Sequence, residues 1–191
     1  MEKRSAGTPQ EERSDQELIA AANNGAAEAF SSLYLRYRDY VTRLARRFTR
    51  NDADALDVLQ ETFSYVLRKF PGFRLTAAMT TFLYPVVKNL SIAARRKRER
   101  FAGAGDAALE GAAAGPTAAA GSPRAREELA AVLARLPETH REVLLLRFVD
   151  DFSLEEIGTA LEIPVGTVKS RLHNALNALR GDERTRRYFG K

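Results

Sequence analysis

Residues 101–123 constrain the fold most, because they divide the chain and are unsuited to any core. They read FAGAGDAALEGAAAGPTAAAGSP and consist almost entirely of Ala and Gly, with two prolines. Side chains this small bury too little apolar surface to offset the entropy of ordering the backbone. We therefore predict a flexible linker at 101–123 between two small domains, 14–100 and 124–181. Residues 1–13 and 182–191 are predicted to be a disordered N-terminus and a tail.

Residues 14–100 carry the hydrophobic period of helices. Apolar side chains recur at steps of three and four residues, which is the spacing of a buried helix face, and no strand-like alternation interrupts them. The predicted inward positions fall on three helices and are Phe30, Leu33, Tyr34, Tyr37, Val41, Leu44, Ala45 and Phe48, then Ala55, Val58, Leu59, Thr62, Phe63, Val66, Leu67 and Phe70, then Leu83, Val86, Val87, Leu90 and Ala94.

Capping and breaking residues set the expected ends of these helices. The pair Ser14-Asp15 is placed to cap a short first helix. Asn51 ends the next helix, and Asp52 is the expected N-cap of the one that follows. The pair Pro71-Gly72 ends that helix and opens a loop.

Residues 124–181 predict four helices that include a helix-turn-helix. A leucine-rich stripe is broken by Pro137, and the next helix, about 140–149, is almost wholly apolar and therefore central. The residues SLEE at 153–156 form a capping box that starts the third helix. A tight turn at 162–164 leads to the fourth helix. Its expected seam consists of Val168, Leu172, Ala175, Leu176 and Leu179.

The outer face of the fourth helix is polar and lacks carboxylates. Opposite the seam stand Ser170, His173, Asn174 and Asn177, flanked by Lys169 and Arg171. Such side chains suit base edges in the major groove, and the cations suit phosphates. Periodicity alone weighs this interpretation about evenly against a solvated amphipathic face.

A basic tract, Arg95-Arg96-Lys97-Arg98-Glu99-Arg100, continues the third N-terminal helix. Like charges this close repel one another unless phosphates neutralise them. Side chains that suit unstacked bases come just before the tract, namely Phe73, Arg74, Phe82, Tyr84, Lys88 and Asn89. The alternatives are a solvated helix end for the cations and core packing for the aromatics, which is favoured for Phe82 taken alone.

The second N-terminal helix carries the opposite charge on its outer face. This stripe consists of Asp54, Asp57, Gln60, Glu61 and Ser64. It should repel DNA and suits a basic protein surface, although a merely soluble face is the commoner case. None of these carboxylates stands with a nucleophile or a cation cluster as catalysis would need.

Composition excludes several kinds of site. The chain has no cysteine and two histidines, so disulfide, thiolate-zinc and iron–sulfur chemistry is excluded, and neither a metal nor a cofactor is expected. No apolar run approaches the ~18 residues of a membrane span. The N-terminus does not resemble a secretory signal, which predicts a cytoplasmic protein. An excess of 30 Lys and Arg over 25 Asp and Glu hints weakly at a polyanionic partner.

Three stretches of the chain resemble bacterial sigma factors of RNA polymerase. Residues 136–180, LPETHREVLLLRFVDDFSLEEIGTALEIPVGTVKSRLHNALNALR, look like their promoter-distal domain, region 4. Residues 54–63, DALDVLQETF, and 80–98, TTFLYPVVKNLSIAARRKR, resemble their promoter-melting domain, region 2. Two such domains and a short linker are similar to the extracytoplasmic-function (ECF) group of the sigma-70 family. The resemblance implies an all-α protein that directs promoter-specific transcription initiation and is not an enzyme.

The resemblance also implies which residues meet the polymerase. Asp57, Gln60 and Glu61 match the positions that dock on the clamp helices of the β′ subunit. The other implied partners are the β flap of core RNA polymerase, promoter DNA and an anti-sigma factor.

Two sets of residues match the positions that meet promoter DNA. The minus-ten element would be opened by the loop and helix that carry Phe73, Arg74, Phe82, Tyr84, Lys88, Asn89, Arg95 and Arg96. Within this set, Asn89 matches a residue that lines a pocket for a flipped base, and Arg95 and Arg96 would hold the strand. The minus-thirty-five element would be read by Thr167, Lys169, Ser170, Arg171, His173 and Asn174.

Several positions depart from the family pattern. They are Leu56 in place of an acid, Phe82 in place of tryptophan, Ala93 in place of aspartate, Glu162 in place of glycine and Asn174 in place of arginine. In addition, Pro85 stands in or just past the first turn of its helix, where it is expected to bend it. These departures predict an unusual promoter preference.

Two other functions are weighed against this one. A stand-alone helix-turn-helix regulator that dimerises on palindromic DNA would not need an acidic docking face followed by a single-strand surface. A nucleic-acid enzyme such as a nuclease would need carboxylates that bind a metal near the basic tract. Asp106 and Glu110, within the predicted linker, are poor candidates for that role.

Overall fold

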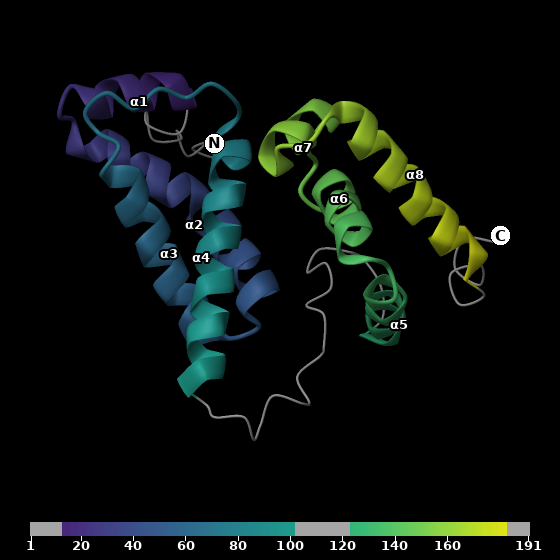
Figure 1. Cartoon of the computed structure of the whole chain (residues 1–191). Coiled ribbons are helices and arrows are strands. Elements are labelled where there is room, and N and C mark those ends of the chain that lie inside the picture. The colour runs from purple at the N-terminus through teal and green to yellow at the C-terminus, as the bar shows by residue number, and fades with distance from the viewer. Residues whose placement is uncertain (1–12, 102–122, 183–191) are drawn as a thin grey trace, which may run out of the picture. The chain divides into compact units, whose positions relative to one another are not determined.

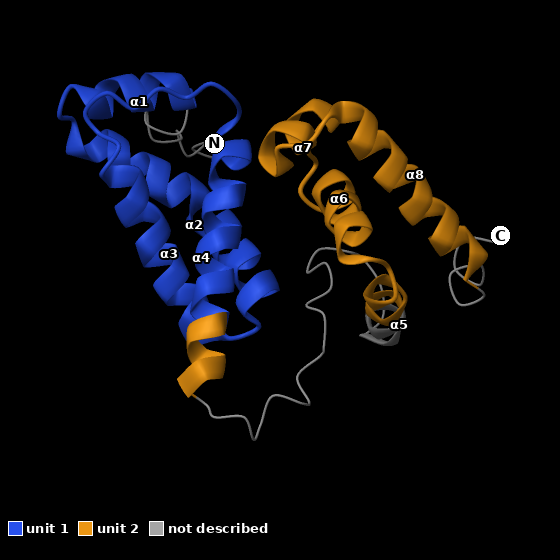
Figure 2. Cartoon of the chain, viewed as in Figure 1, with its two compact units in different colours: residues 1–95 blue, residues 96–191 orange. Residues whose placement is uncertain are grey.

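The protein is all helical in the residues that its computed structural model describes, 13–101 and 123–182. These residues form eight α-helices and no strand, which confirms the predicted fold class. The chain divides into two compact units, residues 1–95 and 96–191 (Figures 1 and 2). The boundary falls inside a helix, after Arg95. The predicted linker and both termini lie almost entirely outside the described residues.

The first unit is built on a hairpin of two long helices. It contains α1 (Asp15–Asn23), α2 (Ala27–Thr49), α3 (Asp52–Leu67) and the larger part of α4 (Met79–Phe101). Only a short connection separates α2 from α3, so they run antiparallel and pack along their lengths. Most of the predicted inward positions are buried, and those without exposure include Leu33, Val41, Leu83 and Val87.

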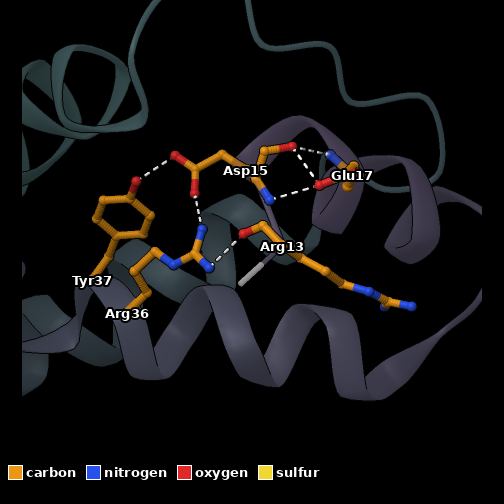
Figure 3. Close-up of polar contacts among 6 residues, drawn as sticks. Arg13, Asp15, Glu17, Arg36 and Tyr37 are labelled. Carbon is orange, nitrogen blue, oxygen red and sulfur yellow. Dashed lines mark hydrogen bonds and ion pairs between the residues drawn. The ribbon is translucent and has the colours of Figure 1, made fainter. Parts of the chain in front are cut away.

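The first helix begins with a reciprocal cap at Ser14, the first of the two residues predicted to cap it. The backbone N–H of Glu17 donates to Ser14 Oγ at 3.3 Å, and the backbone N–H of Ser14 donates to Glu17 Oε2 at 2.7 Å (Figure 3). Because these hydrogen bonds favour the charged carboxylate, they hold the pKa of Glu17 below its usual range. The cap satisfies donors that the first helical turn otherwise leaves without partners.

The same end of α1 is attached to α2 through Asp15. The carboxylate of Asp15 pairs with Arg36 Nη1 at 2.6 Å and accepts a hydrogen bond from the hydroxyl of Tyr37, while Arg36 Nη2 donates to the carbonyl of Arg13 at 2.7 Å (Figure 3). Burial, together with the bond to Asp15, raises the pKa of Tyr37. The Asp15 contacts therefore fix the start of α1 against the middle of α2.

Two predictions for α3 are wrong in detail. Its N-cap is Asn51, whose side chain accepts from the backbone N–H of Asp54 at 2.9 Å. Asp52 is instead the first helical residue and pairs with Arg46 at 2.8 Å. Leu67, predicted to face inward, is 53% exposed. It lies 100° around the helix from the buried Val66, outside the stripe that packs inward.

The buried seam of α4 also differs from the prediction. Of the predicted inward positions, Leu83 and Val87 are buried and the other three, Val86, Leu90 and Ala94, are half-buried. Tyr84 and Ser91, which were not predicted to face inward, are buried. Pro85 lies inside the helix, beyond its first turn. It has no N–H to donate to the carbonyl one turn earlier, yet α4 continues to Phe101.

The second unit holds the helix-turn-helix. Its helices are α5 (Pro123–Ala134), α6 (Glu138–Phe148), α7 (Leu154–Leu161) and α8 (Val165–Gly181). The predicted seam of α8 is confirmed. Ala175 is buried in a core with Leu133, Leu136 and Leu144, and the partly buried side chains packed on it are Leu129, Leu145, Leu172, Leu176 and Leu179. Val168 is buried as well.

The turn between α7 and α8 depends on two backbone positions. The predicted capping box is confirmed at Ser153. At the other end of α7, the C-cap residue Glu162 adopts a left-handed conformation with φ of 54°. The next N–H, that of Ile163, donates to the carbonyl of Gly158 at 2.9 Å. A Cβ on Gly158 would lie 3.0 Å from the carbonyl oxygen of Ile163. The missing side chain at 158 therefore lets the turn close on α7.

Candidate nucleic-acid and protein interfaces

The polar face of α8 is open to solvent. Lys169, Ser170, His173 and Asn174 are exposed, while Thr167 and Arg171 are half-buried. These six are the side chains predicted to read DNA. Val168 and Ala175, both buried, hold the opposite side of the helix against its own unit. The packing of α8 therefore fixes which side chains it offers to a partner.

Two contacts arrange the side chains on this face. Ser170 Oγ donates to the carbonyl of Thr167 at 3.1 Å, which leaves its oxygen free to accept. His173 Nε2 and Asn177 Nδ2 lie 2.8 Å apart, one helical turn from each other. The first turn of α8 holds no acidic residue, and an exposed helix start of this kind favours an approaching phosphate.

The outer face of α3 is acidic and includes exposed apolar surface. Asp57, Gln60, Glu61 and Ser64 are exposed as predicted, whereas Asp54 is half-buried. Leu56, the departure noted beside Asp57, is 51% exposed. An apolar side chain next to carboxylates can exclude water from an ion pair made across a protein interface. This arrangement suits a basic protein partner.

The aromatic residues near the start of α4 divide between core and surface. Phe73 and Tyr84 are 6% and 1% exposed, so their rings pack inside the first unit. Phe82, for which core packing was favoured, is half-buried instead. Its ring stacks on Tyr65 at a centroid distance of 6.5 Å and contacts Phe73 at 5.0 Å. Phe82 is thus the one of these three aromatic residues that is not fully buried.

Polar and basic side chains continue along α4 from this aromatic group. Asn89 and Arg96 are exposed, and Lys88 and Arg95 are half-buried. Arg74, on the loop before the helix, is exposed. The basic tract occupies the end of α4, where the helix dipole favours cations.

Asn23, at the end of α1, contacts the loop before α4 and was missed by the sequence analysis. Its Oδ1 accepts hydrogen bonds from the backbone N–H groups of Gly72 at 2.7 Å and Phe73 at 3.0 Å. Its Nδ2 donates to the carbonyl of Phe73 at 2.9 Å. A contact across fifty residues leaves no local pattern from which it could have been found.

The described residues also bear on a metal site and on a membrane crossing. Among the described residues, no three His, Asp or Glu side chains gather closely enough to hold a metal ion. Over the same residues, none of the helices has both the length and the apolar character that a membrane crossing requires.

Two family models match the chain. Sigma-70 region 2 matches residues 33–101, and Sigma-70, region 4 matches residues 132–181. The second match contains the whole helix-turn-helix, and the first contains α3, α4 and the loop between them. The two models thus coincide with the elements that carry the three surfaces described above.

Full-length relatives and solved structures agree with these matches. The ECF RNA polymerase sigma factor SigW of Bacillus subtilis is 32% identical over 85% of this chain and 92% of its own length. The ECF RNA polymerase sigma-E factor of Escherichia coli K12 is 32% identical over 88% and 94%. The sigma factor RpoE of Bartonella quintana, solved with the anti-sigma factor NepR, shares the fold with a TM-score of 0.62 at 23% identity, over 86% of this chain and 98% of that one. The chain belongs to the ECF group of the sigma-70 family of bacterial RNA polymerase sigma factors.

Proposed function

We propose that this sigma factor directs transcription initiation through three surfaces with separate tasks. The α3 face docks on the β′ clamp helices, the loop and α4 open the minus-ten element, and α8 reads the minus-thirty-five element. The observation that carries the proposal is the division of charge between them. The exposed charged side chains of α3 are all carboxylates, whereas the polar face of α8 and the end of α4 carry cations.

Polymerase docking is assigned to Asp57, Gln60 and Glu61. These side chains are exposed on one face of α3, beside the exposed Leu56. Carboxylates there would repel DNA and would attract a basic pair of helices. In this family the clamp helices of the β′ subunit would be that pair. The β flap is proposed as the second contact on core polymerase.

Strand opening is assigned to a surface made of Arg74, Phe82, Lys88, Asn89, Arg95 and Arg96. A partly exposed aromatic residue beside amide and cationic groups suits a single strand, because bases stack on aromatic rings and cations meet the phosphates. Phe73 and Tyr84 are left out of this surface, since their rings are buried. We assign these two to the packing that supports it.

The Asn89→Ala change is expected to slow opening of the promoter. The exposed amide offers a donor and an acceptor to an unstacked base, and alanine offers neither. Permanganate footprinting of the variant holoenzyme should show reduced reactivity at the minus-ten element, with unchanged binding of duplex minus-thirty-five DNA. A normal footprint would mean that Asn89 does not line the base pocket.

Reading of the minus-thirty-five element is assigned to the polar face of α8. Base-edge contacts discriminate between sequences, whereas phosphate contacts strengthen binding to all sequences alike. We assign Ser170, His173 and Asn174 to base edges. Lys169 and Arg171 are assigned to phosphates, and Thr167 supports the entry of the helix into the groove.

His173→Ala and Asn174→Ala are each expected to relax promoter preference at one or two upstream positions, by about 1–3 kcal/mol per lost base contact. Lys169→Ala should instead weaken binding to all sequences and reduce its salt dependence. Selection from a promoter library with each variant holoenzyme compares these outcomes. An unchanged upstream motif in both the His173 and the Asn174 variants would show that α8 does not read the promoter.

The remaining roles follow from the same assignment. The protein would act in the cytoplasm without catalysing a reaction itself, since the polymerase forms the phosphodiester bonds. An anti-sigma factor is a proposed partner, supported by its presence with the Bartonella quintana relative. We also propose the boundaries 14–100 and 124–181 for the two functional domains. Mapping of transcription start sites after overexpression tests the function as a whole.

A further inference from the structure

We propose that Asn23 is a positioning residue that sets the conformation of the loop 71–78 and, through it, base preference at the minus-ten element. The inference rests on the proposed function of this loop and α4 in opening the promoter. Asn23 lies on α1, outside the elements that carry the DNA-contacting side chains assigned above. It would therefore act on DNA through the loop rather than by contact.

The amide of Asn23 is suited to fix the loop backbone at Phe73. One side chain bonds both the N–H and the carbonyl of this residue, and also the N–H of Gly72. The peptide groups on both sides of Phe73 are held together, because rotation of either would break a bond to the same amide. A hydroxyl is too short to span both groups, and a carboxylate has no donor for the carbonyl.

Gly72 shows why the loop needs this support. Its φ is +102°, a conformation that glycine reaches without strain but that it does not keep by itself. The hydrogen bond from its N–H to Asn23 Oδ1, at 2.7 Å, is the shortest of the three. Without it, the backbone at 72 has more conformations available, and the position of the loop that follows is less restricted.

The fixed backbone at Phe73 is coupled to the proposed single-strand surface in two ways. The ring of Phe73 contacts Phe82 at 5.0 Å and Phe70 at 5.4 Å. Its backbone precedes Arg74, which is exposed, so the direction of the Arg74 side chain depends on the peptide group that Asn23 holds. A change at 23 is thus transmitted to both Phe82 and Arg74.

The helix that carries Asn23 is also attached to α2 at its other end. At the far end of α1, Asp15 is bonded to Arg36 and Tyr37 of α2. A helix fixed to α2 at one end and bonded to the loop at the other transmits position rather than absorbing it. This double attachment favours a positioning role over a local stabilising one.

The test uses holoenzymes made with the full chain. Asn23→Ala removes all three hydrogen bonds, whereas Asn23→Asp keeps acceptors for Gly72 and Phe73 and loses the donor. Asn24→Ala is the matched control, since Asn24 is exposed and its side chain makes no hydrogen bond to the described part of the chain. Each holoenzyme selects from a promoter library randomised at both elements, and amide exchange is followed by NMR in the free protein.

We expect Asn23→Ala to change discrimination at one or more minus-ten positions by about 2- to 30-fold, the range of couplings that act through packed networks. Asn23→Asp should give a smaller change at the same positions, and Asn24→Ala none. The minus-thirty-five motif and the affinity for core polymerase should stay as in the wild type. The amides of Gly72 and Phe73 should exchange faster in Asn23→Ala.

Wild-type minus-ten preference in both Asn23 variants would overturn the inference. If the alanine variant does not fold, the aspartate variant decides alone, because it keeps two of the three bonds and lacks the third.

Phe82→Ala and Asn89→Ala distinguish failure of this inference from failure of the proposed function. If they alter minus-ten selection and the Asn23 variants do not, only the role of Asn23 is wrong. If none alters it, the assignment of the loop and α4 to the minus-ten element is wrong.

Discussion

Reversing the charge of Asp57 and Glu61 together, by Asp57→Lys and Glu61→Lys, is expected to abolish assembly with core RNA polymerase. Both side chains are exposed on the outer face of α3, so a docked partner would remove them from water. Lysines there would meet a basic surface with like charge, at an expected loss of a few kcal/mol of binding free energy. The fold should survive, because neither side chain contributes to the core.

A matched control makes the docking result interpretable. Glu28→Lys with Asp39→Lys changes the net charge equally, from exposed positions on α2. This pair should assemble as the wild type does. A pull-down with core polymerase at several salt concentrations measures both variants, and circular dichroism checks their helix content. If the α3 variant and the control bind core polymerase with equal affinity, the assignment of the α3 face to docking is wrong.

Loss of the Tyr84 ring is expected to have the largest effect on stability. Its side chain is 1% exposed and lies against Phe48, with ring centroids 6.1 Å apart. Truncation of a buried aromatic residue to alanine costs about 3–5 kcal/mol, through lost transfer free energy and the cavity left behind. Tyr84→Ala should therefore unfold the first unit at markedly lower denaturant concentration.

Phe82→Ala is the comparison for Tyr84, since Phe82 is half-buried in the same region. Its truncation should cost less unfolding free energy and impair promoter opening in protein that remains folded. Urea titrations and permanganate footprints separate the two effects. A Tyr84→Ala protein with wild-type stability and defective opening would mean that Tyr84 meets DNA and is not a packing residue.

Periodicity and capping chemistry predicted most of the architecture. Ser14 and Ser153 begin their helices because each hydroxyl is followed three residues later by a glutamate that completes the cap. The seam of α8 follows from the spacing of its apolar residues alone. Such features are local, so a single sequence contains what is needed to find them.

The errors arose where residue type does not determine backbone conformation or burial. Two adjacent polar residues, Asn51 and Asp52, were equally able to cap α3, and only backbone conformation distinguishes them. Phe73, Phe82 and Tyr84 are all aromatic, and their residue type says nothing about which ring is covered. The role of Asn23 depends on Gly72 and Phe73, far along the chain, so no spacing could reveal it.

The attachment of α1 at both ends has a consequence for the order in which the chain folds during synthesis. Domains generally fold as units, beginning with the N-terminal one, as they leave the ribosome. Asp15 finds Arg36 and Tyr37 early, because they follow within the next helix. Asn23 finds its partners only when residue 73 emerges, fifty residues after it. The nascent chain therefore passes through an interval in which α1 is packed on α2 but lacks the hydrogen bonds from Asn23 to Gly72 and Phe73. That interval closes before any part of the helix-turn-helix has been translated.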